Sequence, residues 1–290
     1  MQNRQDKIMG NIDYCEYLFK TTDRSNLYGQ SWRSTHSHGV VVIVHGYAEH
    51  SGRYQWAALQ LVDRGFAVYT FDLRGHGKSS GIRNLVRSYD DCLTDLATFI
   101  QQVKLKEPDR SLFLFGHSFG GTIAALFAIR SQPLLNGLIL SSAFLGANRH
   151  ISTLQLRLIM LISYLLPKFP TLFLNSHTLS RDLDVVEIYE ADLLIGRGRM
   201  PARTLVEMLK ATAEIQSRTN EIELPILILH GTEDRLVSME GSKNFYLSVG
   251  SKDKSIELYD GFYHELLNEP EKIRVLSDIE VWLRKHLPTV

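Results

Sequence analysis

The chain has 290 residues, with 32 basic and 32 acidic side chains and a formal net charge of zero. This balance argues against nucleic acid as a partner and against a strong field that would steer a polyanion. The length allows one or two domains, although α/β chains of this size are often a single domain. The composition is that of a folded soluble protein without low-complexity tracts.

The two cysteines, Cys15 and Cys92, have no metal-type spacing. The segment from Met1 to Tyr14 contains no apolar stretch, so no secretory signal is expected. We therefore predict two free thiols in a reducing compartment and a cytoplasmic protein. The sequence contains no zinc-type His/Cys spacing, no P-loop and no dinucleotide glycine fingerprint, so neither a metal nor a cofactor is expected.

Short, unbroken apolar runs recur along the chain and are typical of parallel strands covered on both faces. A hairpin is predicted first, with strands from Tyr14 to Lys20 and from Leu27 to Trp32. The later strand-like runs are 40–44, 66–71, 112–115, 138–140, 226–229 and 255–259. The helix-like segments between and after them are 54–64, 91–106, 122–130, 238–248 and 271–287. This alternation predicts an α/β fold with an open, mostly parallel sheet flanked by helices.

The alternation stops between Ala143 and Glu223, where we find no convincing strand. We interpret this segment as a helical insertion over the strand ends at which ligands usually bind. The predicted organisation is a core of residues 1–142 and 224–290, with a helical cap over 143–223. The most apolar stretch, Leu158 to Leu166, lies in this cap. It is about half as long as a bilayer span requires, and it predicts either a buried helix or a helix that dips into a membrane surface.

A G-x-S-x-G motif from Gly116 to Gly120 lies between a strand-like and a helix-like run. In this context the motif predicts a sharp strand-to-helix turn with Ser118 at its tip. Small neighbours are needed around such a strained turn, and the two glycines meet that need. Ser118 would stand at a helix N-terminus, where free N–H groups and the helix dipole favour a developing negative charge. The alternative is a glycine-rich turn without a catalytic role.

A serine hydroxyl needs a base within hydrogen-bond reach and a carboxylate that orients the base. In α/β-hydrolases the chain order is Ser, then Asp or Glu, then His. Ser118, Asp234 and His264 follow this order, each just past a predicted strand. Glu233 is the nearest alternative acid. Only His264, among the eleven histidines, follows the acid after another full strand, and His117 is expected to point away into packing.

The oxyanion of a tetrahedral intermediate needs two preorganised donors. The N–H of Phe119, directly after the nucleophile, is one, and the favoured second is the N–H of Tyr47 in the loop after the first parallel strand. Arg74, His76 and Lys78 suggest a phosphate site, but the glycines between them favour a purely structural loop.

These motifs together resemble the serine hydrolases of the α/β-hydrolase superfamily, and more closely the monoglyceride lipase and lysophospholipase family. The resemblance covers nearly the whole chain and is most specific over 45–54, 72–79 and 116–121. Residues 179–181 and 188–189 are also similar to that family's cap. The resemblance implies the following roles: nucleophile Ser118, acid Asp234, base His264, oxyanion donors Tyr47 and Phe119, and glycerol-side lining residues Glu49, Arg53 and Tyr189. The residue at position 47 is often small in that family, so Tyr47 is expected to narrow the acyl entrance.

The resemblance implies a cofactor-free carboxylic ester hydrolase that acts on a lipid with one acyl chain, with monoacylglycerol as the expected substrate. Its partners would be the lipid substrate and a membrane surface touched by the cap. A lysophospholipase or a short-chain esterase would use the same triad, and relatives of this shape also cleave amide or peptide bonds. Outside the enzymes, the alternatives are a non-catalytic binding module and a membrane-associated interaction protein.

Overall fold

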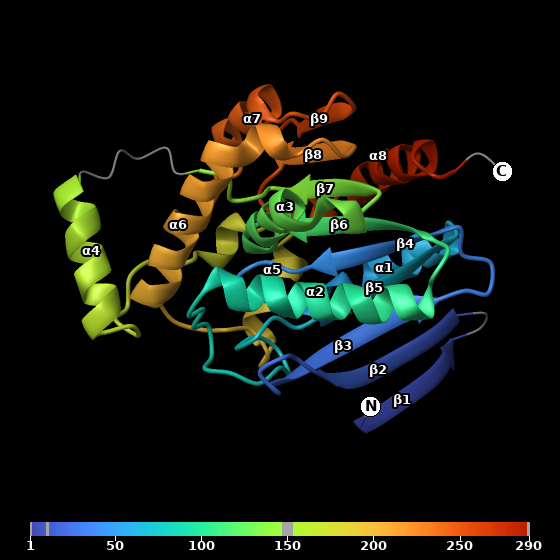
Figure 1. Cartoon of the computed structure of the whole chain (residues 1–290), viewed down its shortest axis with the longest axis horizontal. Coiled ribbons are helices and arrows are strands. Elements are labelled where there is room, and N and C mark those ends of the chain that lie inside the picture. The colour runs from blue at the N-terminus through green and yellow to red at the C-terminus, as the bar shows by residue number, and fades with distance from the viewer. Residues whose placement is uncertain (1, 10–11, 147–152, 289–290) are drawn as a thin grey trace.

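The computed structural model describes residues 2–9, 12–146 and 153–288 (Figure 1). Its strands are β1 (Gln2–Met9), β2 (Ile12–Lys20), β3 (Asn26–Arg33), β4 (Gly39–Val44), β5 (Phe66–Phe71), β6 (Ser111–His117), β7 (Gly137–Ser141), β8 (Ile226–Gly231) and β9 (Lys254–Tyr259). Its α-helices are α1 (Gln55–Asp63), α2 (Tyr89–Lys106), α3 (Phe119–Ser131), α4 (Thr153–Leu165), α5 (Leu183–Ala191), α6 (Ala202–Arg218), α7 (Met239–Ser248) and α8 (Lys272–Lys285). Short 3-10 helices are η1 (Ser51–Tyr54), η2 (Gln132–Leu134), η3 (Ser176–Thr178), η4 (Thr219–Glu221) and η5 (Leu266–Asn268).

One sheet joins the nine strands in the order β1-β2-β3-β5-β4-β6-β7-β8-β9. The pairs from β5 to β9 are parallel, whereas β1, β2 and β3 form antiparallel pairs at one side. The predicted α/β-hydrolase sheet and its initial hairpin are therefore confirmed. The edge strand β1 was not predicted, because its sequence is mostly polar and an edge strand needs no continuous apolar run.

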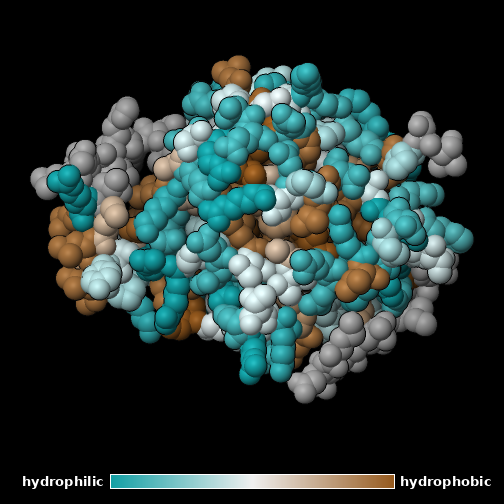
Figure 2. Space-filling view, viewed as in Figure 1, coloured by the Kyte–Doolittle hydropathy of each residue, from teal (hydrophilic) through white to brown (hydrophobic). Residues whose placement is uncertain are grey.

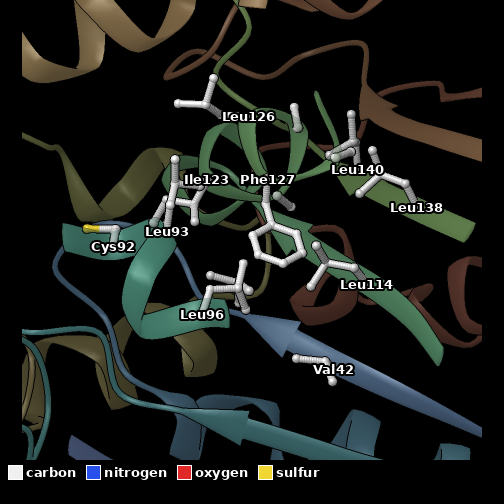
Figure 3. Packing of buried hydrophobic residues seen from close by; sticks show 14 of the residues in the cluster. Val42, Cys92, Leu93, Leu96, Leu114, Ile123, Leu126, Phe127, Leu138 and Leu140 are labelled. Atoms are coloured by element: carbon white, nitrogen blue, oxygen red, sulfur yellow. The ribbon is translucent and has the colours of Figure 1, made fainter. Parts of the chain in front are cut away.

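Helices cover both faces of the sheet, and each central strand sends alternate side chains to the two layers. In β4, Val40, Val42 and Val44 pack with α2, α3, α6 and α7, while Val41 and Ile43 pack with α1 and α8. Figure 3 shows the first layer, in which strand residues such as Val42 meet side chains of α2 and α3. The central strands are therefore buried on both sides, which explains their unbroken apolar sequences.

Helices α4, α5 and α6 lie between β7 and β8, in the segment that the sequence predicts as a cap. Within the described part of that segment, the β structure consists of one isolated bridge, from Pro170 to Pro201. Residues 147–152 of the predicted cap lie outside the described residues. Helix α4 stands at the left edge of the molecule in Figure 1, with Leu161 54% and Leu165 63% exposed. The alternative that Leu158 to Leu166 forms a buried helix is therefore wrong.

Among the helices that the structure describes, none is both long and apolar enough to cross a bilayer.

Candidate active site

Ser118 lies at the turn between β6 and α3, as the motif predicts. Its backbone has φ 52° and ψ −117°, a left-handed conformation that costs about 1–3 kcal/mol in a residue other than glycine. The turn is held because the Ser118 N–H donates to the carbonyl of Ser141 at 2.9 Å. The side chain makes no capping hydrogen bond to α3, and it lines a cavity. The turn therefore presents the hydroxyl to the cavity instead of to the helix.

Two glycines allow this turn to pack closely against its surroundings. A Cβ on Gly116 would approach the carbonyl oxygen of Gly120 to 2.6 Å. A Cβ on Gly120 would lie 2.2 Å from the carbonyl oxygen of Val44, the last residue of β4. Both distances are far below van der Waals contact, so the motif's glycines are required for α3 to begin beside β4.

Asp234 and His264 come from the loops after β8 and β9 and meet in a direct hydrogen bond. The Nδ1 atom of His264 donates to Oδ2 of Asp234 at 2.7 Å. The other carboxylate oxygen accepts the N–H groups of Leu236 and Val237 at 2.8 and 2.9 Å. Burial opposes the charged form of Asp234, but His264 and His230 outweigh it and hold the pKa of the carboxyl well below its usual range. A permanently ionised carboxylate therefore orients the His264 ring.

His264 is buried, and its pKa reflects two opposing influences. Burial disfavours the imidazolium, but the carboxylates of Asp234, Glu265 and Glu49 favour it more strongly, so the pKa lies above its ordinary value. Ser118 and His264 line the same cavity. The structure thus brings the three predicted triad residues to one site.

His117 lies closer to this site than the sequence suggests. Its ring centroid is 4.8 Å from that of His264, and it lines the same cavity, so the expectation that it points away is wrong. Its Nδ1 lies 3.1 Å from the carbonyl of Ser141, to which it donates. Burial and the neighbouring His264 lower the pKa of His117 to about 4, which keeps the ring neutral near pH 7.

The loop after β4 brings Tyr47 to the cavity opposite the start of α3. Phe119 is the first residue of α3, so its N–H has no acceptor within the helix. The rings of Tyr47 and Phe119 lie 6.0 Å apart, and both residues line the cavity with Ser118. An internal hydrogen bond stabilises the conformation of this loop, because the Gly46 N–H donates to the Glu49 carboxylate at 2.5 Å. The two predicted oxyanion donors therefore belong to neighbouring residues that line the same cavity as the serine.

A buried ionic cluster forms part of the cavity wall. Arg53 donates to Glu49 at 2.8 Å and to both carboxylate oxygens of Glu265 at 2.6 and 2.7 Å. Its guanidinium also lies 4.8 Å from the centroid of the Tyr189 ring. Glu49, Glu265 and Tyr189 line the cavity, whereas Arg53 does not. Sequence reasoning missed Glu265, whose only local signal is its position directly after His264.

The remaining cavity wall is apolar. It consists of Phe144, Leu172, Leu174, Leu179, Met200, Met208, Leu236 and Val237. Most of these residues come from the segment between β7 and β8. The cavity therefore combines a polar group of residues around Ser118 with an apolar lining suited to a hydrocarbon chain.

The loop from Asp72 to Lys78 is structural, as its glycines indicate. Arg74 makes two hydrogen bonds of 2.7 Å to the buried carboxylate of Asp95. The Lys78 N–H donates to Asp72 at 2.7 Å, and His76 donates from Nδ1 to the Arg74 carbonyl at 3.0 Å. The arginine is thus neutralised from within the protein, and the phosphate-site alternative finds no support. Within the described ranges, no group of three or more His, Cys, Asp or Glu side chains is placed to hold a metal ion.

The fold and the site together define a serine hydrolase of the α/β-hydrolase superfamily. Residues 35–271 match the family model described as serine aminopeptidase, S33. The chain is 33% identical to the monoacylglycerol lipase of Mycolicibacterium smegmatis, over 87% of this chain and 90% of the relative. It is 30% identical to the monoglyceride lipase of Mus musculus, over 90% and 88% of the two chains.

A solved structure, the monoacylglycerol lipase of Paleococcus ferrophilus, superimposes with a TM-score of 0.81 at 30% identity, covering 90% of this chain and 99% of that one. The chain therefore belongs to this serine hydrolase family, beside its monoglyceride lipases, and it is a serine ester hydrolase.

Proposed function

We propose that the protein hydrolyses monoacylglycerol to a free fatty acid and glycerol through Ser118, His264 and Asp234. The observation that carries this proposal is the hydrogen bond from His264 to Asp234 at the wall of a cavity that Ser118 also lines. A nucleophile, an orienting carboxylate and a base, in that chain order, constitute the acyl-transfer machinery of this fold.

In the proposed reaction, Ser118 Oγ attacks the ester carbonyl carbon while its proton passes to Nε2 of His264. The Asp234 carboxylate stabilises the imidazolium, and the N–H groups of Tyr47 and Phe119 donate to the oxyanion. Collapse of the intermediate breaks the ester C–O bond, and His264 returns the proton to the leaving glycerol oxygen. Water, deprotonated by His264, then attacks the acyl-enzyme and releases the fatty acid and the free serine.

The lining of the cavity supports a single-chain lipid as substrate. Its apolar residues suit one hydrocarbon chain, while Glu49 and Tyr189 supply polar groups for glycerol hydroxyls. The bulky Tyr47 side chain is anchored by a hydrogen bond of 3.3 Å to the Asn84 carbonyl, which favours a narrow entrance for the chain. Because relatives in the family are named monoacylglycerol or monoglyceride lipases, glycerol is the favoured head group of the substrate.

The segment 143–223 acts, in this proposal, as a cap that also meets the lipid surface. Figure 2 shows brown, apolar residues gathered at the left edge of the molecule, where Figure 1 places α4. The exposed large apolar side chains of α4 and of the segment that follows it are Leu158, Met160, Leu161, Tyr164, Leu165, Leu166, Phe169, Leu172 and Phe173. A contiguous apolar surface of this kind marks a membrane or protein contact. The cytoplasmic location expected from the sequence stays a prediction.

The triad is tested by Ser118→Ala, with Ser131→Ala at the other end of α3 as the control. We expect kcat on monoacylglycerol to fall by about a million-fold for Ser118→Ala and to stay near the parent value for Ser131→Ala. Intact-mass measurement with a slowly hydrolysed ester should detect an acyl adduct in the parent and none in Ser118→Ala. A residual rate within about tenfold of the parent would refute the assignment.

The head group is tested with a hydrolysis panel of monoacylglycerols, lysophospholipids, short nitrophenyl esters and amino-acid amides. We expect the highest kcat/KM on monoacylglycerol. A higher kcat/KM on the lysophospholipids would establish the lysophospholipase alternative, and preference for the amides would establish a peptidase.

A further inference from the structure

The charged side chains that line the cavity carry a negative sign. Apart from its histidines, the titratable lining residues with a formal charge near neutral pH are Glu49 and Glu265. Among the described residues no lysine or arginine lines this cavity. An anionic head group bound there would meet two carboxylates and no lysine or arginine.

One buried cation, Arg53, contacts both carboxylates and is already paired with them. Its guanidinium donates to Glu49 and Glu265, and its side chain is 8% exposed. The guanidinium also lies 4.8 Å from the centroid of the Tyr189 ring, which lines the cavity, whereas Arg53 does not. A ligand phosphate would therefore compete with two buried carboxylates for Arg53, and a carboxylate that lost this partner would be a buried unpaired charge.

Both carboxylates are ionised near neutral pH. Burial opposes ionisation of Glu49, but Arg53, His117, His45 and the Tyr54 hydroxyl together outweigh it and lower the pKa to about 2. Burial also opposes ionisation of Glu265, and the charge and hydrogen bonds of Arg53, with a smaller contribution from His117, lower the pKa of Glu265 below its ordinary value. Two carboxylates and one guanidinium leave the cluster with a net charge of −1. A buried net charge interacts strongly with a ligand charge because little water screens it.

We propose that Glu265 is a specificity-determining residue that makes the cavity accept a neutral alcohol head group and reject an anionic one such as a phosphate. This inference rests on the proposed function, since it concerns the leaving group of the ester that Ser118 attacks. The proposal assigns the net negative charge of the cavity wall to Glu265 and gives this charge a role in substrate choice.

Glu265 is the member of the cluster whose charge can be removed with least disturbance. Glu49 also accepts the Gly46 N–H at 2.5 Å and the Tyr54 hydroxyl at 2.7 Å, so it shapes the loop that carries Tyr47. Glu265 accepts from Arg53 and from Asn268 Nδ2, at 2.8 Å, and unlike Glu49 it has no bond to Gly46. In Glu265→Gln, Arg53 keeps its pairing with Glu49 and the cluster becomes neutral.

The experiment compares two substrates that differ only by a phosphate: a monoacylglycerol and the 3-phosphate of the same monoacylglycerol. Both are presented at low mole fraction in micelles of one uncharged detergent, so that the surface charge is constant. We expect the parent to favour the neutral substrate in kcat/KM. Glu265→Gln should raise the ratio of phosphate-bearing to neutral substrate by about tenfold or more.

Two control variants separate charge from shape. Glu265→Asp keeps the charge and should keep the parent's ratio, even where its absolute activity falls. Glu269→Gln removes another buried carboxylate from the same loop, one that pairs with Arg181 and does not line the cavity. It should also leave the ratio unchanged. A global loss of structure would lower activity on both substrates together.

Each outcome decides a separate point. An unchanged ratio in Glu265→Gln, or an equal change in Glu269→Gln, overturns the proposal. A parent that prefers the phosphate-bearing ester overturns it too. Failure of the proposed function gives a different result. The parent would then hydrolyse neither substrate, or the Ser118→Ala variant would still hydrolyse both. Either result refutes the triad and not the charge selection.

Discussion

Four titratable groups influence the protonation of the proposed base, His264. His264 bonds to Asp234, with Glu265 and Glu49 nearby, and these three carboxylates favour the imidazolium. The neighbouring His117 is neutral, since its pKa is lowered to about 4. The imidazolium that forms during attack by the serine is therefore stabilised, while the free base is protonated at a higher pH than an ordinary histidine.

This balance predicts the acid limb of the pH profile. Only neutral His264 can accept the serine proton, so kcat/KM should fall with decreasing pH through a pKa above the ordinary value of 6.5. Loss of the Glu265 charge removes a group that favours the imidazolium, so it lowers this pKa. The acid limb of Glu265→Gln should therefore move to lower pH. The measurement is kcat/KM against pH on a soluble, uncharged ester.

The matched control is again Glu269→Gln, whose carboxylate is bound to Arg181 and to the N–H of Tyr263. Its acid limb should coincide with that of the parent. A shift of Glu265→Gln to higher pH, or no shift, would contradict the assigned influence of this carboxylate on His264.

The sequence is sufficient to predict that the three proposed triad residues meet at one site, but not to predict the ionic cluster. Ser118, Asp234 and His264 each follow a buried strand, and the ends of parallel strands meet at one edge of the sheet. Local pattern and chain order are therefore enough to bring them together. Glu265 gains its role by pairing with Arg53, which is 212 positions away, and no local pattern records that contact. His230 differs, because it lies only four positions from Asp234, with its Nε2 3.2 Å from the carboxylate.

Helix α4 has an exposed apolar face that no other described part of the chain covers. Ser163 is buried on its inner side, while Leu161, Tyr164 and Leu165 are 54%, 78% and 63% exposed. Contact with a lipid surface would remove this apolar area from water. Burial of each large apolar side chain would contribute about 1 kcal/mol or more to the free energy of lipid binding.

We predict that Leu161→Glu combined with Leu165→Glu weakens action on aggregated lipid more than on a soluble ester. The double change removes two apolar contacts and adds two charges that resist burial, so liposome binding should fall about tenfold to a hundredfold. The measurements are co-sedimentation with neutral liposomes and kcat/KM on monoacylglycerol micelles and on a short soluble ester.

The control carries Leu105→Glu and Val281→Glu, two exposed apolar positions on α2 and α8 outside the patch. It should bind liposomes as the parent does. Equal losses on the soluble and the aggregated substrate in the α4 variant would remove the docking role from this helix.

At the scale of elements, apolar pattern predicts the central strands and amphipathic helices but not the exposure of α4. An unbroken apolar strand such as β4 is stable in one environment, between two layers of helices. The apolar sequence of α4 is compatible with two environments, a protein core or a lipid surface. Only the tertiary position of the helix decides between these two. Strand β1 is not predicted by apolar pattern at all, because its pairing with β2 depends on backbone hydrogen bonds at an open edge of the sheet.

Across the whole molecule, the segment between β7 and β8 is tied to the loop that carries Tyr47. The N–H of Gly196 donates to the Ala48 carbonyl at 2.7 Å. His50 donates from Nε2 to Asp192 at 2.8 Å, since its Nδ1 accepts the N–H of Gly52. The position of the predicted cap and the shape of the predicted oxyanion loop are therefore linked.

This link predicts that Asp192→Ala loosens the loop from a distance. Asp192 does not line the cavity, but its loss leaves the His50 ring without a carboxylate. The pair is partly exposed, so we expect a cost of about 1–2 kcal/mol and a fall of about five- to thirtyfold in kcat/KM on a short soluble ester. Hydrogen exchange of peptides covering residues 46–54 should quicken, because the loop opens more often. Asp184→Ala, on the exposed first turn of α5, is the control and should change neither quantity. Faster exchange confined to the cap, with normal exchange at 46–54 and an unchanged kcat/KM, would show that the two parts move independently.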